Sequence, residues 1–121
     1  MSTPKKIMIV DDHAAIRTTV CSLFARQGFD VCAAENGDEA VTQAQEQHPD
    51  LVVLDLAMPV MNGFEAARAL KRLMPKIPLL MFTGTVGVTV EQEAHAAGIA
   101  VVVSKNESTD RLVAQAKRLL T

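Results

Sequence analysis

Acidic side chains follow two short apolar runs of the sequence, at the point where each run ends. Residues 51–54 (LVVL) lead directly into Asp55, and residues 6–10 (KIMIV) lead into Asp11 and Asp12. Short apolar runs with β-branched residues are typical of strands buried on both faces, and such strands belong to parallel sheets. The ligand sites of these sheets lie beyond the carboxyl ends of the strands. We therefore interpret Asp55 as the residue on which chemistry is done.

A hydroxyl and an ammonium group follow two further apolar runs. Residues 79–82 lead to Thr83, and residues 100–103 lead to Ser104 and Lys105. Two carboxylates about 5 Å apart repel each other by roughly 3 kcal/mol at an effective dielectric constant near 20. A hard divalent cation relieves this repulsion, and Mg²⁺ commonly takes one or two carboxylates together with water. A metal site, a nucleophilic carboxylate, a hydroxyl and a cation are the groups that phosphoryl transfer to an aspartate requires.

Strand and helix patterns alternate five times along the chain. The expected strands are 6–10, 29–34, 51–54, 79–82 and 100–103. The expected helices follow them, starting after Asp12, after Gly37, at Asn62-Gly63, at about residue 86 and near Ser108. This alternation predicts an α/β fold, a flavodoxin-like (βα)5 doubly wound parallel sheet of strand order 2-1-3-4-5 in three α/β/α layers. The first and third strands are neighbours in that order, so Asp11, Asp12 and Asp55 should crowd together. Asp12 is also the expected N-cap of the first helix.

The composition is ordinary for a globular chain of one domain. Its 121 residues are long enough for one core, which we expect over about residues 5–120 of a single domain spanning 1–121. The net charge of −2 and the absence of a basic run longer than Lys5-Lys6 argue against nucleic-acid contact. No apolar run reaches the ~18 residues that a membrane span needs. Cys21 and Cys32 are isolated, so we expect reduced thiols and a cytoplasmic protein.

The chain resembles, over essentially its whole length, the receiver domains of two-component response regulators. The matching positions are the chemically specific ones at the strand ends: Asp11, Asp12, Asp55 (within DLAMPVMNG), Thr83 and Lys105. Asp12-His13 and Lys105-x-Glu107-Ser108 are most similar to the subgroup that carries a C-terminal helix-turn-helix DNA-binding domain. No such domain follows in this sequence, so we expect either a stand-alone receiver or part of a longer protein.

The resemblance implies a role for each residue of the acidic group. Asp55 would accept a phosphoryl group from a phosphohistidine on a histidine kinase or a histidine phosphotransfer protein. Asp12 and Asp55 would ligate Mg²⁺ directly, and Asp11 would do so through water. The backbone carbonyl of Ala57 would complete the metal site.

Thr83 and Lys105 would each hold one oxygen of the transferred phosphoryl group. Because these contacts form only when that group is present, they can bias a two-state element. Thr83 would be drawn inward, and the 84–90 segment would follow. We therefore expect the helix over 86–97, the strand over 100–103 and the last helix to form the output face, which could also support a homodimer.

Two positions depart from the family's usual pattern. Val102 stands where the family usually has Tyr or Phe, so the aromatic part of its switch is missing. Any switching would then use Thr83 and the helix that follows it. Asn106 follows Lys105 where proline is common, and a cis peptide bond before a residue other than proline costs ~3 kcal/mol. We therefore predict a trans Lys105–Asn106 bond.

Apolar and small residues surround the expected site in its loops. By the resemblance, Ala57 and Thr85 line the route of an attacking water. Met58, Val60 and Met61 either pack against the third helix or form a patch for a partner, and we favour packing. The resemblance also implies that the positions of Ala57 and Thr85 tune how long a phosphoryl group persists.

Other functions are weighed against the receiver hypothesis. An aspartyl phosphatase would need a second carboxylate two residues past Asp55, where Ala57 stands. A flavin or nucleotide binder would need a Gly/Ser/Thr-rich loop where this chain has DDHAAI. A docking module that is never phosphorylated stays open because of Val102. His13 is interpreted as a solvated residue at a helix start rather than a ligand.

Overall fold

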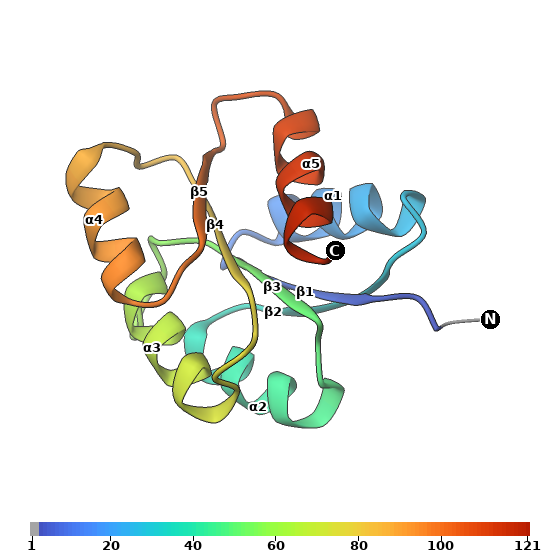
Figure 1. Cartoon of the computed structure of the whole chain (residues 1–121), viewed down its shortest axis with the longest axis horizontal. Helices are drawn as coiled ribbons and strands as arrows, with labels where there is room; N and C mark the ends of the chain where they lie inside the picture. Colours follow the sequence, from blue (N-terminus) through green and yellow to red (C-terminus); the bar gives the residue numbers. More distant parts are fainter. Residues whose placement is uncertain (1–2) are drawn as a thin grey trace.

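Five parallel strands form one sheet between two layers of helices, as the computed structural model shows for residues 3–121 (Figure 1). The strands are Lys6–Val10 (β1), Asp30–Ala34 (β2), Leu51–Leu54 (β3), Leu79–Thr83 (β4) and Val101–Ser104 (β5). The helices are Ala14–Arg26 (α1), Gly37–Gln47 (α2), Gly63–Leu73 (α3), Val88–Ala96 (α4) and Thr109–Leu119 (α5). The strand order is β2-β1-β3-β4-β5 with every pair parallel, which confirms the predicted flavodoxin-like topology.

The two faces of the sheet bury separate aliphatic cores. Met8 and Val10 of β1 face the core covered by α2, α3 and α4, whereas Ile7 and Ile9 face the core covered by α1 and α5. The central strand β3 is buried along its whole length, because it lies between β1 and β4 and has helices on both faces. Successive side chains of each strand point to opposite faces of the sheet, so each face is covered by its own layer of helices. The position of the site depends on these two layers.

Side-chain caps set the starts of two helices where the sequence placed them. The Asn62 carboxamide accepts a hydrogen bond from the Glu65 backbone N–H at 3.0 Å, and the Glu65 carboxylate accepts one from the Asn62 N–H at 3.1 Å. This reciprocal pair is a capping box. Ser108 caps α5 through its hydroxyl alone, which accepts a hydrogen bond from the Asp110 backbone N–H at 3.1 Å, so both predicted starts are confirmed.

The N-cap prediction for α1 is wrong by one residue. His13, not Asp12, is the N-cap of α1, and its side chain makes no capping hydrogen bond. The Asp11 carboxylate instead accepts the His13 backbone N–H at 2.9 Å. The acid pair is therefore left for other contacts rather than used to begin the helix.

Element ends near the expected site differ from the prediction by one or two residues. Thr83 is the last residue of β4 and pairs in register with Ser104 of β5, so both hydroxyls belong to the sheet rather than to loops. The helix after β4 starts at Val88 because Gly87, its N-cap, has a φ of 146°, which a residue with a side chain rarely adopts. No cis peptide bond occurs within residues 3–121, so the predicted trans Lys105–Asn106 bond is confirmed.

The β3–α3 loop, residues 55–62, satisfies the packing prediction only in part. Met58 is buried in the core beneath α2, α3 and α4, and Met61 packs against the same core. Val60, between them, is 91% exposed, so the expectation that it packs inward is wrong. Two apolar anchors therefore hold this loop and leave one apolar side chain in solvent.

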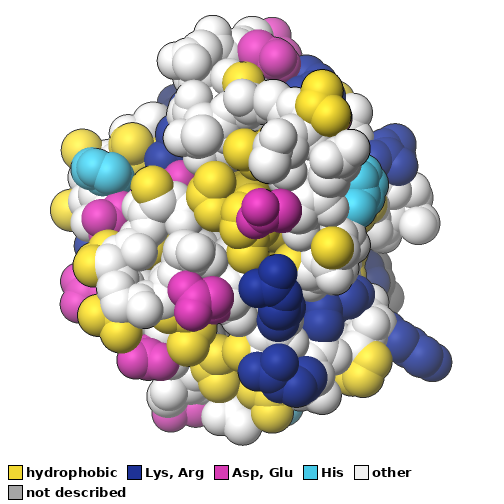
Figure 2. Space-filling model, turned by 90° about the vertical axis from the view of Figure 1, so that its left-hand side faces the viewer, with side chains coloured by type: hydrophobic (Ala, Val, Ile, Leu, Met, Phe, Trp, Pro, Cys, Tyr) yellow, Lys and Arg dark blue, Asp and Glu magenta, His cyan; other side chains and the backbone are white. Residues whose placement is uncertain are grey.

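Lys and Arg side chains gather on the side of the molecule where α3 and α4 lie (Figure 2). Arg68, Lys71 and Arg72 line an open groove between these helices. They are brought together by helical spacing rather than by a basic run in the sequence. Within residues 3–121, no helix is long and apolar enough to span a membrane. Cys21 and Cys32 are free, partly buried thiols, and burial raises the pKa of each.

Candidate functional site

Asp55 follows the last residue of β3 and is held there by the neighbouring strand. Its backbone N–H donates to the carbonyl of Val10 at 2.9 Å, which extends the β1–β3 pairing by one residue. Its Oδ1 accepts a hydrogen bond from the Leu56 N–H at 2.8 Å. Its side chain is only 4% exposed, and Oδ2 lies 3.3 Å from the Lys105 ammonium. Asp55 is thus a fixed carboxylate with one oxygen directed at a cation.

The groups around Asp55 shift the pKa of its carboxyl in opposite directions. Burial raises the pKa of its carboxyl above the ordinary value, and repulsion from Asp11 acts in the same direction. Attraction to Lys105 and the hydrogen bond from Leu56 lower the pKa, but burial is the larger effect. A carboxyl whose pKa is raised in this way is typical of sites that bind a ligand or carry out a reaction.

Lys105 bridges the two buried acids. Its Nζ lies 2.7 Å from Asp11 Oδ2 as well as 3.3 Å from Asp55 Oδ2, and its side chain is 17% exposed. Its backbone N–H donates to the Thr83 carbonyl at 2.9 Å, and its ammonium lies 6.0 Å from the centre of the Phe82 ring. The pairing of β4 with β5 thus fixes where this cation enters the acidic cluster.

Asp12 and His13 complete the solvent side of the cluster. The His13 Nδ1 lies 3.1 Å from Asp11 Oδ1 and 3.1 Å from Asp12 Oδ1. His13 is exposed, as expected, but its ring faces the acids. One ligand atom from each of Asp11, Asp12, His13 and Asp55 lies within 4.8 Å of the others. Three carboxylates of this kind offer the hard oxygen donors that Mg²⁺ prefers, so the donor set fits that ion.

Thr83 and Ala57, the other predicted members, lie on neighbouring segments of the same sheet edge. Thr83 is buried at the end of β4, and its Oγ1 accepts a hydrogen bond from the Thr85 N–H at 3.2 Å. Ala57 is exposed in the β3–α3 loop, two residues past Asp55. The structure therefore brings Asp11, Asp55 and Lys105 into direct contact and sets Asp12 beside them. Thr83 meets that group only through its backbone, where its carbonyl accepts the Lys105 N–H, and within residues 3–121 no side-chain hydrogen bond joins Thr83 or Ala57 to the cluster.

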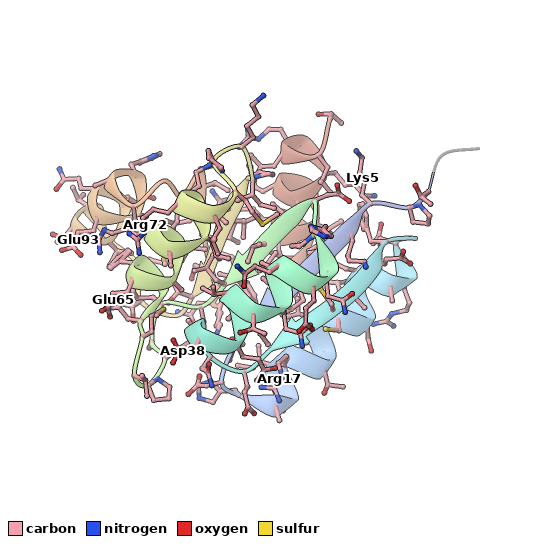
Figure 3. The ribbon with its side chains drawn as sticks, turned by 90° about the horizontal axis from the view of Figure 1, so that it is seen from below. Lys5, Arg17, Asp38, Glu65, Arg72 and Glu93 are labelled. Atoms are coloured by element: carbon pink, nitrogen blue, oxygen red, sulfur yellow. The ribbon has the colours of Figure 1, made fainter. Side chains whose placement is uncertain are left out.

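Arg17 is a member of this region that the sequence interpretation missed. Its guanidinium, on α1 (Figure 3), donates to the backbone carbonyl of Asp11 at 2.7 Å. The contact fixes the strand end that carries both Asp11 and Asp12. The available signal was a cation five residues past the predicted N-cap, near the start of the predicted helix. Arg17 is a positioning residue, because its contact is to backbone rather than to the carboxylates.

Asp55→Asn should make the metal-free protein more stable at neutral pH, with a gain that disappears in acid. A carboxyl whose pKa is raised by folding binds protons better in the folded chain. Its contribution to stability is therefore greatest below the pKa of the unfolded chain, and it is lost as the pH rises through the folded pKa. Asparagine removes this loss. Urea unfolding with EDTA, from about pH 3.5 to 8, measures the difference between the two proteins.

The acid end of that titration is the internal control, because there both side chains are neutral. A variant that is less stable than the wild type at neutral pH, by an amount that does not change in acid, would contradict the assignment of a raised pKa to Asp55.

Known proteins share this fold and part of this sequence. A family model described as the response regulator receiver domain matches residues 7–117. The transcriptional regulatory protein LnrK of Bacillus subtilis is 36% identical over 110 residues, which cover 89% of this chain and 50% of that protein. The structure of the chemotaxis protein CheY4 of Vibrio cholerae superposes with a TM-score of 0.93 at 31% identity, over 98% of this chain and 100% of that one. Response regulator TrrA of Thermotoga maritima, solved with Mg²⁺ and BeF, gives a TM-score of 0.88 at 28% identity, over 96% and 99% of the two chains.

This chain therefore belongs to the receiver-domain family of two-component response regulators. Receiver domains are signalling switches rather than metabolic enzymes. The chain spans about half the length, or less, of the transcriptional regulators that it matches.

Proposed function

We propose that this chain is a phosphorylation-dependent switch in which Asp55 accepts a phosphoryl group from a phosphohistidine on a histidine kinase or phosphotransfer protein. One observation carries the proposal: a single ammonium, Lys105, lies within ion-pair distance of two buried carboxylates, Asp11 and Asp55, at the carboxyl end of the sheet. Burying two carboxylates and an ammonium together costs desolvation free energy. Stability alone therefore gives no reason to keep them there. The receiver relatives and the Mg²⁺–BeF complex of TrrA support the same proposal.

The metal of this switch would be Mg²⁺, held by the acids at the sheet edge. Asp12 and Asp55 would ligate it directly, Asp11 through water, and the carbonyl of Ala57 would complete the set. The ion would supply positive charge next to the oxygens of the phosphoryl group. Asp12 is exposed while Asp11 and Asp55 are buried, so the cluster offers a hydrated side from which an ion could enter.

The residues of this chain would divide the work of the transfer. An Asp55 oxygen attacks phosphorus, the bond from phosphorus to the histidine nitrogen breaks, and the histidine nitrogen leaves with the electron pair of that bond. Lys105 would then exchange its contact with Asp55 for one with a phosphoryl oxygen, while keeping Asp11 as a partner. Thr83, at the end of β4, would donate its hydroxyl to another oxygen instead of accepting the N–H of Thr85.

The signal would leave through α4, β5 and α5. Movement of Thr83 would carry with it residues 84–87, which connect β4 to α4 and are exposed. Val102 of β5 is only partly buried and has no ring to rotate, so the β4–α4 connection would carry the change alone. The same face could pair two copies of the chain. We propose that the protein is cytoplasmic. We also propose that residues 1–121 themselves contact no nucleic acid.

The decisive experiment is labelling with acetyl phosphate and Mg²⁺, followed by intact-mass measurement. The wild-type chain should gain the mass of one phosphoryl group, and Asp55→Ala should gain none. Asp38→Ala, which removes an exposed carboxylate on α2 (Figure 3), is the matched control and should label as the wild type does. No gain in the wild type would leave a docking module without phosphorylation, and a gain that survives Asp55→Ala would move the acceptor elsewhere.

A further inference from the structure

The β3–α3 loop leaves the site and returns to it. It starts at Asp55, and its far end is fixed by a hydrogen bond from the Gly63 N–H to the Leu56 carbonyl at 2.8 Å. Residues 57–62 therefore form an excursion whose two ends meet beside the acceptor carboxylate. Val60 lies near the middle of this excursion, in a loop that leaves the sheet at the same strand end as Asp55.

The backbone at Val60 is strained. Its φ is 69°, and the Met61 N–H donates to the Pro59 carbonyl at 2.7 Å across it. A positive φ with a hydrogen bond spanning one residue is the rarer, strained form of the γ-turn. A β-branched residue is a genuine outlier in this conformation, whereas glycine and asparagine adopt it readily.

The side chain of Val60 gains nothing from the fold. It is 91% exposed, more than any other large hydrophobic side chain in residues 3–121. Met58 is buried, and Met61 lies so close to Gly37 of α2 that a Cβ at Gly37 would meet its sulfur at 2.7 Å. These two anchors fix the loop and direct the residue between them outward. Neither the backbone nor the packing therefore explains why this position holds valine.

We propose that Val60 is an apolar contact for the protein that donates the phosphoryl group, packing against an apolar patch beside the donor's phosphohistidine. The proposal rests on the proposed function of Asp55. A protein donor has to bring its histidine to the edge of the sheet at which this loop lies. The donor's surface would then cover the two exposed methyl groups of Val60. A small donor such as acetyl phosphate reaches Asp55 without covering the loop. Val60 takes no part in bond making or breaking.

Two variants separate this contact from the strain. Val60→Asn relieves the backbone and removes the apolar surface, whereas Val60→Leu removes the β-branch and keeps the surface. Each is phosphorylated with acetyl phosphate and with the purified, autophosphorylated histidine kinase of the encoding genome that labels the wild type fastest. Leu73→Asn, which changes an exposed apolar residue at the end of α3 remote from the site, is the control.

Val60→Asn should lower kcat/KM for transfer from the kinase about tenfold, in line with the loss of one well-packed interface side chain. It should leave the acetyl phosphate rate unchanged and raise the melting temperature by roughly 4 °C. Val60→Leu and Leu73→Asn should transfer from the kinase within about twofold of the wild type, since both keep the apolar contact at position 60.

Several results would overturn the proposal. Val60→Asn could transfer from the kinase at the wild-type rate, or could lose both donors equally, which would indicate a structural role. Equal losses for Val60→Asn and Val60→Leu would show that side-chain shape, and not apolar contact, is what counts. A wild type labelled by acetyl phosphate but by no kinase would remove the protein donor while leaving Asp55 as acceptor. A wild type labelled by neither would overturn the proposed function itself.

Discussion

Lys105→Ala should lower the free energy of unfolding by about 3 kcal/mol at neutral pH in metal-free buffer, because it leaves buried charge without a partner. The lysine ammonium lies 2.7 Å from Asp11 and 3.3 Å from Asp55, and each of these carboxylates is only 4% exposed. No other Lys or Arg in residues 3–121 pairs with either carboxylate. Without Lys105 the two buried acids repel each other with no cation between them.

Urea unfolding with EDTA measures this loss, and two conditions should reduce it. Mg²⁺ should restore part of the stability, because it takes over the neutralising role. Acid should also do so, because burial already raises the pKa of Asp55 and its carboxyl takes up a proton. Lys105→Arg keeps the charge and should lose less. Lys117→Ala is the matched control, since within residues 3–121 that ammonium makes a single hydrogen bond, to the Gln27 side chain on the surface. A Lys105→Ala protein as stable as the Lys117→Ala protein would contradict the ion-pair account.

The same change should slow phosphorylation by acetyl phosphate about 100-fold, the usual effect of removing one donor to a developing oxyanion. The rate is measured at saturating Mg²⁺, where the loss of stability is smallest. Asp55 remains present in this variant, so labelling should still reach the same site, only later. A normal rate would mean that Lys105 serves only to balance charge in the folded chain.

Much of this arrangement could be predicted because it follows from topology. Strand order 2-1-3-4-5 makes β1 and β3 neighbours, so residues that follow their ends must meet, and Asp11 and Asp55 do. Lys105 was expected near a phosphoryl oxygen, and the structure shows that it contacts both acids directly. Spacing along the sequence placed its Cα at the correct strand end. The direction of a long side chain depends on its neighbours, and the sequence pattern does not contain that information.

The errors lie where several local solutions compete. Asp12 and His13 are both acceptable at a helix start, and the choice depends on the Asp11 carboxylate accepting the His13 N–H. Val60 was expected to pack inward because it is apolar. The loop instead buries Met58 and Met61, and the chain between two such anchors has to turn outward. Periodicity describes strands and helices well, but it says little about a loop whose course is set by side chains that contact other elements.

Gly63→Ala should destabilise the protein by about 3 kcal/mol, at the upper end of the usual effect of overpacking. Gly63 is the first residue of α3, and a Cβ there would fall against the Asp55 carbonyl oxygen and lie 2.9 Å from the Leu56 Cα. Both are backbone atoms of the segment that carries the acceptor, so neither can rotate away. The helix start or the end of β3 would have to move.

Gly84→Ala is the matched control for that change. A Cβ at Gly84 meets nothing within 4 Å, so its stability in urea should stay within about 0.5 kcal/mol of the wild type. Gly63→Ala should also slow labelling by acetyl phosphate in the fraction that remains folded, because the displaced backbone is that of Asp55. A variant that loses stability but labels at the normal rate would show that α3 yields and β3 does not. A variant with normal stability and normal rate would show that the approach of α3 to Asp55 does not hold the acceptor in place.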